Sequence, residues 1–288
     1  MTQALFGQLL IGLINGSFYA LLSMGLAIIF GLLNVVNFAH GAQYMLGAYL
    51  AWMGLTYLGI GYWVALVAVP LVVGVSGMLV ERLLLRRLQG LDNLYGLLLT
   101  FGLALVVEGL FRWQFGISGN AYPVPESLRG GTNLGFMFLP LYRAWVVVAA
   151  LAVCFVSWFV IEKTRLGAYL RAGTENPKLL QAFGVNVPLM FTLTYGYGAA
   201  LAGFTGVMAA PVYQVTPAMG SAIIIVVFAV VVIGGMGSII GSVVTGVGLG
   251  LLEGLAKFLY PELSATVVYI IMALVLLVRP AGLFGREA

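Results

Sequence analysis

Apolar residues occur in long runs along the whole chain, with short polar breaks between them. Runs such as residues 223–233 are apolar at every position, whereas β-barrel strands alternate apolar and polar residues. The pattern predicts an all-α protein, a polytopic bundle of transmembrane helices with about eight to ten spans. These include a broken or half-helix near residues 31–41. The predicted spans lie at about 5–32, 38–58, 62–80, 94–111, 144–161, 190–210, 220–236, 240–257 and 264–279.

Composition agrees with a chain embedded in a membrane. Of the 288 residues, 62% are hydrophobic and 8% are charged, whereas a soluble domain carries about 25% charged residues. No water-soluble core buries this much apolar surface, so lipid must be the solvent for most of the chain. At roughly 20 residues for each span, the length fits one compact bundle, and we expect residues 1–288 to form a single domain.

The distribution of lysine and arginine predicts the orientation, because cytoplasmic loops are enriched in both. If the predicted spans alternate, nine of the thirteen basic residues fall on one side: Arg82, Arg86, Arg87, Lys163, Arg165, Arg171, Lys178, Arg279 and Arg286. The other four are Arg112, Arg129, Arg143 and Lys257. The first side is therefore predicted to be cytoplasmic, with the C-terminus inside and the N-terminus outside. A long outer loop over about 112–143 is expected to be an irregular cap.

Small residues recur at intervals of four in three of the predicted spans. Such stripes mark helix contacts in membranes, where lipid gives helices no hydrophobic reason to associate. The stripes are Gly12, Gly16 and Ala20; Gly198, Ala202, Gly206 and Ala210; and Ser242, Gly246, Gly250 and Gly254. Together they predict a tightly packed bundle, in which some faces can also contact a second subunit.

Polar residues interrupt the apolar pattern between Gly31 and Gly41, too close to either apolar run for a roomy surface loop. Backbone that leaves helical geometry at membrane depth must line a cavity or be buried in protein. Asn37 is predicted to cap a helix that begins at residue 38 or 39. We expect part of a solute pathway here, lined by Asn34, Asn37, His40 and Gly41. For His40 alone, the residues favour a structural role at the bend, and no metal site is expected.

A second break contains Gly234, Gly235, Gly237, Ser238 and Gly241. This density of glycine predicts a tight turn that ends one helix and starts the next with little room between them. The turn can lie near the solute path or on an ATPase-facing surface, or it can be a simple helical hairpin. The residues alone do not decide between these alternatives.

Acidic residues are scarce within the predicted spans. Glu108 lies four residues before Arg112, and Glu253 lies four before Lys257, a spacing at which opposite charges pair on one helix face. We therefore expect a structural role for both pairs. No acid or base stands alone at mid-span, which argues against proton or sodium coupling. One histidine without a nearby cysteine or acid offers no catalytic site, so an enzyme is not expected.

The loop over about 162–188 contains a short helix with well-defined ends. Asn176 is a good N-cap, Pro177 suits the first helical position, and Gly184 suits the left-handed residue beyond the helix. The helix is predicted at about 177–183. Three apolar residues form one patch on it: Leu179, Leu180 and Phe183. A helix this short is marginal in water, so the patch must rest on this protein's own helices or on a soluble partner.

Short motifs follow one another from end to end of the chain. They are Asn15-Gly-Ser-Phe-Tyr-Ala-Leu with Gly25-Leu, Asn34-Val-Val-Asn37-Phe-Ala-His40-Gly41, Gly47-Ala-Tyr49, Arg171-Ala-Gly-Thr-Glu-Asn176-Pro177 with Gly184-Val-Asn186, Gly234-Gly-Met-Gly237-Ser-Ile-Ile-Gly241, and Arg279-Pro280-Ala-Gly282-Leu-Phe-Gly285. Each motif alone is weak, but the ordered set is specific. In this set the sequence resembles the LivH-type permeases of the high-affinity branched-chain amino acid ABC importers, over nearly the whole chain.

The resemblance implies a permease subunit of an ATP-driven importer for branched-chain amino acids or related small solutes, with residues 1–288 as its transmembrane permease domain in the bacterial inner membrane. The implied partners are a second related permease, two cytoplasmic ATPase subunits and an extracytoplasmic solute-binding protein, with no nucleic acid. ATP and Mg²⁺ are expected on the ATPases and no cofactor on this chain, which has no Gly-x-x-x-x-Gly-Lys-Ser/Thr loop. The alternative is an ATP-independent secondary transporter or channel for small amides or urea.

The resemblance also implies a role for the loop over about 162–188. In families of this type the corresponding cytoplasmic helix docks on the ATPase, which favours a soluble partner for the apolar patch. The residues expected to take part in docking are Arg171, Glu175, Asn176, Pro177, Leu179, Leu180, Phe183 and Gly184.

Overall fold

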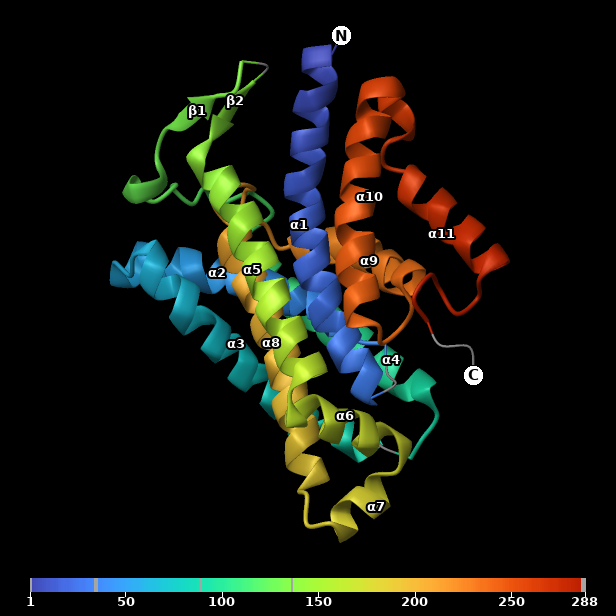
Figure 1. Ribbon diagram of the computed structural model, residues 1–288. Helices are drawn as coiled ribbons and strands as arrows, with labels where there is room; N and C mark the ends of the chain where they lie inside the picture. The colour runs from blue at the N-terminus through green and yellow to red at the C-terminus, as the bar shows by residue number, and fades with distance from the viewer. Residues whose placement is uncertain (1, 34–35, 89, 136, 286–288) are drawn as a thin grey trace. The chain divides into compact units, whose positions relative to one another are not determined.

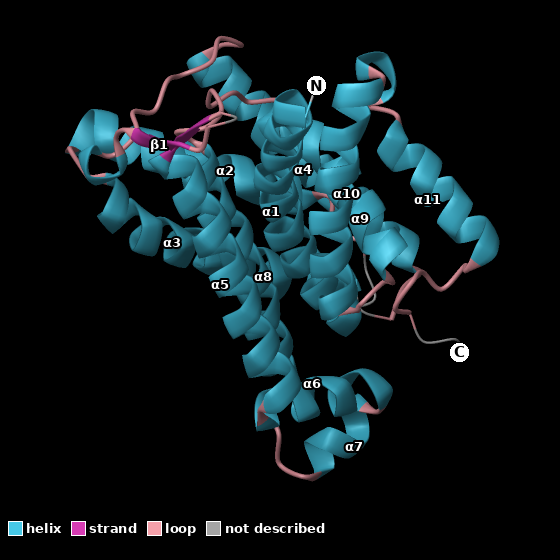
Figure 2. Cartoon of the chain, turned by 45° about the horizontal axis from the view of Figure 1, so that its top comes forward, coloured by secondary structure: helices cyan, strands magenta, loops and turns pink. Residues whose placement is uncertain are grey.

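The computed structural model describes residues 2–33, 36–88, 90–135 and 137–285, and helices make up most of this length (Figure 1, Figure 2). The helices that overlap the predicted spans are α1 (Thr2–Leu33), α2 (Ala39–Leu58), α3 (Tyr62–Leu83), α4 (Asn93–Phe115), α5 (Leu141–Lys163), α8 (Val187–Ala209), α9 (Met219–Gly234), α10 (Ile239–Leu259) and α11 (Val267–Val278). Among the described residues, six of these are long and apolar enough to cross a bilayer, and α9 and α11 are shorter apolar helices. The predicted all-α, polytopic helical bundle is confirmed, and the span count agrees roughly.

Several short elements connect the long helices. Two of them, α6 (Arg165–Glu175) and α7 (Pro177–Ala182), lie between α5 and α8. Single 3₁₀ turns occur at η1 (Leu85–Leu88), η2 (Glu126–Leu128) and η3 (Pro261–Leu263). The sequence predicted α7 but not α6.

The loop between α4 and α5 is more ordered than the irregular cap that was expected. Strands β1 (Gly131–Asn133) and β2 (Phe138–Pro140) pair antiparallel, with Thr132 opposite Leu139. A separate bridge joins Asn120 to Val215, whose backbone N–H and C=O groups exchange two bonds of 2.9 Å. These pairings satisfy backbone groups that an irregular loop would leave to water.

The chain divides into two compact units. One consists of Met1–Met24, Pro123–Phe155 and Ile225–Ala288, and the other of Gly25–Tyr122 and Val156–Ile224. Helices α1, α5 and α9 each contribute residues to both units.

In the first unit, α1 and α10 approach each other through the two predicted stripes of small residues. A Cβ atom on Gly12 would collide with the backbone oxygen of Gly250, and one on Gly246 would lie 2.6 Å from Cα of Ala20. Polar contacts add to this packing, because the Tyr19 hydroxyl donates to Glu253 Oε2 at 2.8 Å. A small apolar core beside it is formed by Ala229, Val230, Ile233, Leu249 and Val268. The prediction that these stripes are helix contacts is confirmed.

In the second unit, α8 packs closely against α2 and α3. A Cβ atom on Gly203 would lie 2.8 Å from Cβ of Val73 on α3, and one on Gly206 would lie 2.8 Å from the backbone nitrogen of Ala48 on α2. The stripe predicted on this span therefore forms helix contacts as well. Helix α8 is thus in close contact with both α2 and α3.

Candidate functional site

The described part of the polar segment, around the start of α2, is buried rather than open. Asn34 lies outside the described residues. The side chain of Asn37 is 1% exposed and that of His40 is fully buried, lying against Gly25, whose Cβ atom would be 3.0 Å from His40 Cε1. Gly41 packs against the start of α9, since its Cβ atom would lie 2.6 Å from the Gly220 oxygen. The predicted role of these residues in a solute pathway stays a prediction.

The predicted cap at Asn37 is wrong. Helix α2 begins at Ala39, and its N-cap residue is Phe38, which makes no side-chain cap bond. Phe38 already has nearly helical backbone angles, φ −72° and ψ −22°, so Asn37 lies one residue too early to cap. Its backbone oxygen instead accepts a bond from the His40 N–H at 3.4 Å. The Asn37 side chain is near the hydroxyl of Tyr195 on α8, as is the side chain of Gln43.

An open groove with a volume of about 50 Å³ lies beside this segment. It is walled by α2, α4 and the start of α9, all within the second unit. Its lining residues are Phe38, Ala42, Met45, Phe101, Ala104, Leu105, Glu108, Pro217, Gly220, Ser221 and Ile224. Asn37 and His40 are not among these lining residues. From this part of the chain, the groove is lined by Phe38, Ala42 and Met45. Glu108 is the one charged residue in the lining.

The predicted pairing of Glu108 with Arg112 is confirmed. Arg112 Nη2 lies 2.8 Å from Glu108 Oε1, and the two side chains are 54% and 16% exposed. The second predicted pair also forms, with Lys257 Nζ 2.6 Å from Glu253 Oε1. The two pairs differ in their surroundings, because Glu253 also accepts the Tyr19 hydroxyl whereas Glu108 lines the groove.

Helix α7 has the ends that the sequence predicted. Asn176 Oδ1 accepts the Leu179 N–H at 3.0 Å, Pro177 occupies the first helical position, and Gly184 has a φ of +84°. In Figure 1, α7 lies at the level of the first turn of α8, and α6 lies above α7 in the view. Arg171, on α6, pairs with Glu162 at 3.2 Å, and Glu175 is the exposed last residue of α6.

The predicted apolar patch on α7 is divided. Leu180 is 7% exposed, and it lies close to Gly173 on α6, whose Cβ atom would be 3.5 Å from Leu180 Cδ2. Leu179 and Phe183 remain 54% and 77% exposed. The prediction of a single three-residue patch is therefore wrong, because α6 covers one of its members.

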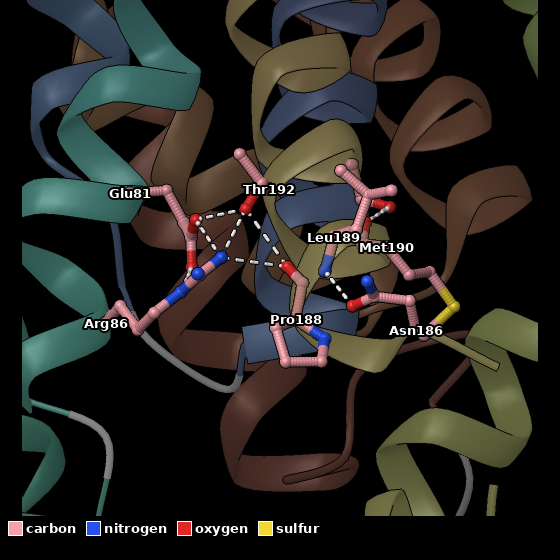
Figure 3. A network of polar contacts seen from close by, with 8 residues as sticks. Glu81, Arg86, Asn186, Pro188, Leu189, Met190 and Thr192 are labelled. Carbon is pink, nitrogen blue, oxygen red and sulfur yellow. Dashed lines mark hydrogen bonds and ion pairs between the residues drawn. The ribbon is translucent and has the colours of Figure 1, made fainter. Parts of the chain in front are cut away.

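A buried carboxylate that the sequence analysis missed lies at the end of α3. Glu81 is fully buried, and with Arg86 and Thr192 it forms what we call the Glu81 cluster (Figure 3). Arg86 Nη2 lies 3.2 Å from Glu81 Oε2, and the Thr192 hydroxyl donates to the same oxygen at 2.6 Å. Arg86 also donates to the Pro188 carbonyl at 2.9 Å. The cluster thus ties α3 and η1 to the first two turns of α8, the helix that follows α7.

The glycine-rich segment between α9 and α10 forms a tight turn. Gly235 and Gly237 have φ angles of +99° and +86°, which other residues adopt only with strain. Ser238 caps α10 by accepting the Gly241 N–H at 3.1 Å, and a Cβ atom on Gly234 would lie 2.6 Å from the carbonyl carbon of Gly241.

The same turn binds a segment near the end of the chain. The backbone N–H of Leu283 donates to Ile233 O at 2.8 Å, and that of Phe284 donates to Gly234 O at 3.1 Å. The motifs at 234–241 and 279–285, far apart in the sequence, are therefore in contact.

A comparison with protein families identifies the chain. The model described as "Branched-chain amino acid transport system / permease component" matches residues 8–276. The chain belongs to this family. The permease is therefore a multi-pass membrane protein with a transport role, and it is not an enzyme.

Curated relatives agree with this assignment. The permease is 30% identical to the high-affinity branched-chain amino acid transport system permease protein BraD of Pseudomonas aeruginosa, over 97% of this chain and 95% of the relative. It is also 30% identical to the permease protein LivH of Escherichia coli K12, with the same coverage. Identity to LivM of that organism is 27%, over 92% of this chain and 67% of the relative. No solved structure matches.

Proposed function

We propose that the permease is the membrane subunit of an ATP-driven importer for branched-chain amino acids or related small solutes. Its membrane is the bacterial inner membrane, and its C-terminus is cytoplasmic. The substrate class follows from the names of BraD and LivH. The orientation follows from the nine basic residues predicted on one side against four on the other.

The proposed partners are a related second permease, two cytoplasmic ATPases and an extracytoplasmic solute-binding protein. One organism has both LivH and LivM, each a permease protein of a high-affinity branched-chain amino acid system, which supports a pair of related permeases. The sequence has no phosphate-binding Gly-x-x-x-x-Gly-Lys-Ser/Thr loop. We therefore place ATP and Mg²⁺ on the ATPases and no cofactor on this chain.

The observation that carries the proposal is the exposed apolar pair on α7. Leu179 and Phe183 are one helical turn apart, and both are more than half exposed. Residues four positions apart lie on one face of a helix, so Leu179 and Phe183 form a small exposed apolar surface on a helix whose two ends are fixed. Such a surface fits a groove on the ATPase. Force on α7 would pass to α8, which packs on α2 and α3.

Replacing both exposed residues, Leu179→Asp with Phe183→Asp, is expected to reduce co-purification of the ATPase subunits by about tenfold or more, since losing interface hot spots costs about 2 kcal/mol or more. The measurement is quantitative mass spectrometry of the complex after mild detergent extraction. Leu91→Asp is the matched control, because Leu91 is 54% exposed on a loop predicted to lie on the same side. Normal ATPase recovery with the double variant would contradict the docking role.

The alternative, an ATP-independent transporter or channel for small amides or urea, is not favoured by the family. Coupled transporters use charged groups within the membrane to bind or relay ions. In the described part of the chain, Glu81, Glu108 and Glu253 are each paired with a basic residue. Solute movement through the purified permease alone, in liposomes without ATP, would overturn the proposed function.

A further inference from the structure

The groove between α2, α4 and α9 has the composition of a small-molecule site. Ligand pockets are mainly apolar, with a few polar groups that fix orientation. This groove is open, and it is walled by side chains such as Met45, Phe101 and Ile224. Its lining combines those apolar walls with a single carboxylate, Glu108.

Glu108 lies at the groove with spare bonding capacity. An ionised carboxylate has two oxygens and about four acceptor positions, and the salt bridge to Arg112 involves Oε1. Arg112 lies one helical turn further along α4 and is 54% exposed, so its planar guanidinium retains donors for a second anion. The pair therefore presents a negative group and a positive group next to each other beside an apolar surface.

We infer that this groove is a binding subsite for free α-amino acids with apolar side chains, a ligand class that rests on the proposed function. Such a molecule carries an ammonium and a carboxylate on one carbon atom. When the amino acid lies beside the ion pair with its charges opposite those of the protein, its ammonium binds Glu108 and its carboxylate binds Arg112. Its side chain then packs against Met45, Phe101 and Ile224. Charge-assisted bonds of this kind are the stronger ones in proteins.

The second ion pair of the same type shows why the inference concerns Glu108 alone. Glu253 and Lys257 have the same spacing, and Glu253 is similarly shielded, with a side chain 13% exposed. Its two oxygens accept bonds from Lys257 and Tyr19, at 2.6 Å and 2.8 Å. Both oxygens of Glu253 therefore already have partners, Lys257 on α10 itself and Tyr19 on α1. Glu253→Gln is thus a matched control for Glu108→Gln.

The first experiment measures ATP-driven uptake of radiolabelled leucine by the complete importer in proteoliposomes. Glu108→Gln is expected to lower the uptake rate by about tenfold or more, because truncating one member of a desolvated charged contact weakens binding strongly. Glu253→Gln is expected to stay within about twofold of the parent, since Tyr19 and Lys257 can still bond to the amide oxygen. Equal effects of the two substitutions would overturn the inference.

The second experiment detects the ligand directly. Ser221 lies on the groove wall and is exposed, while the single cysteine, Cys154, is buried. In a Ser221→Cys variant of the purified complex, millimolar leucine is expected to slow maleimide labelling. Leucinamide, which lacks the carboxylate, and 4-methylpentanoate, which lacks the ammonium, are expected to protect far less. Adding Glu108→Gln is expected to remove the protection by leucine.

The outcomes separate this inference from the proposed function. If added phospholipid slows the labelling and leucine does not, the groove is a lipid site and the inference is overturned. Equal protection by leucine and by 4-methylpentanoate would also overturn it, because the ammonium would then play no part. Failure of the parent importer to take up leucine with ATP would instead count against the proposed function, whereas leucine protection is measured without transport.

Discussion

Gly250→Ala is expected to destabilise the permease strongly, whereas Gly248→Ala on the same helix is not. A Cβ atom on Gly250 would collide with backbone atoms of Gly12 and Gly16 on α1, and backbone cannot rotate away as a side chain can. Overpacking of this kind costs about 1–3 kcal/mol, and sometimes more. Because small residues allow the close approach of membrane helices, the extra methyl group would push α10 away from α1. The measurement is thermal unfolding of the purified permease in detergent.

Gly248 provides the control within two residues of the test site. It is also inside α10, and a Cβ atom there would meet nothing within 4 Å. Replacing glycine by alanine in a helix interior stabilises by roughly 0.5–1 kcal/mol, so Gly248→Ala is expected to leave the melting temperature unchanged or raise it slightly. Similar losses in both variants would mean that glycine at position 250 is not needed for close packing.

The sequence was enough to locate the long helices because lipid imposes a simple rule. A span must hide its backbone in a helix and present apolar side chains, so the runs themselves mark the spans. Even α2, which contains His40 and Gln43, overlaps a span that the apolar pattern predicts at about 38–58. By contrast, α6 was missed. Two glycines, Gly167 and Gly173, lie inside it and are poor helix formers. Both are buried, so packing stabilises a helix that local propensity does not favour.

The cap predicted at Asn37 is wrong, but local chemistry predicted both ends of α7 correctly. Asn176, Pro177 and Gly184 define α7 because their roles depend on neighbours within a few residues. Which side of α7 is covered depends on α6, so the pattern within α7 alone does not separate the buried Leu180 from the exposed Leu179.

The candidate sites were predicted least well because their residues are far apart in the sequence. Glu81 was placed in a loop, and its partner Thr192 is 111 residues away. The helix spacing did reveal the Glu108–Arg112 pair. Glu108 faces a groove because Met45 and Ile224 form other parts of the groove wall, and no pattern in the sequence connects these two residues to Glu108.

Arg86→Ala is expected to produce one of the largest losses of stability of any single substitution in the second unit. It removes the cation beside Glu81, whose side chain is fully buried. Removing one partner of a buried ion pair typically costs about 3–5 kcal/mol, because the remaining charge has no compensation. Arg86 is itself 32% exposed, so water reaching the vacated site would place the loss at the lower end. Thermal unfolding in detergent measures the change.

Companion variants separate the charge of Glu81 from its packing. Thr192→Val removes one donor to the carboxylate and is expected to cost about 1–3 kcal/mol. Arg129→Ala is the control for an exposed pair, since Glu126 and Arg129 are 88% and 61% exposed. Its expected cost is below about 1 kcal/mol.

Adding Glu81→Gln to Arg86→Ala is expected to restore part of the lost stability, because a neutral amide is less costly to bury than a lone carboxylate. If the double variant is instead no more stable than Arg86→Ala, the loss comes from the packing of the Arg86 side chain and from its lost bond to the Pro188 carbonyl. The electrostatic account of the Glu81 cluster would then be wrong.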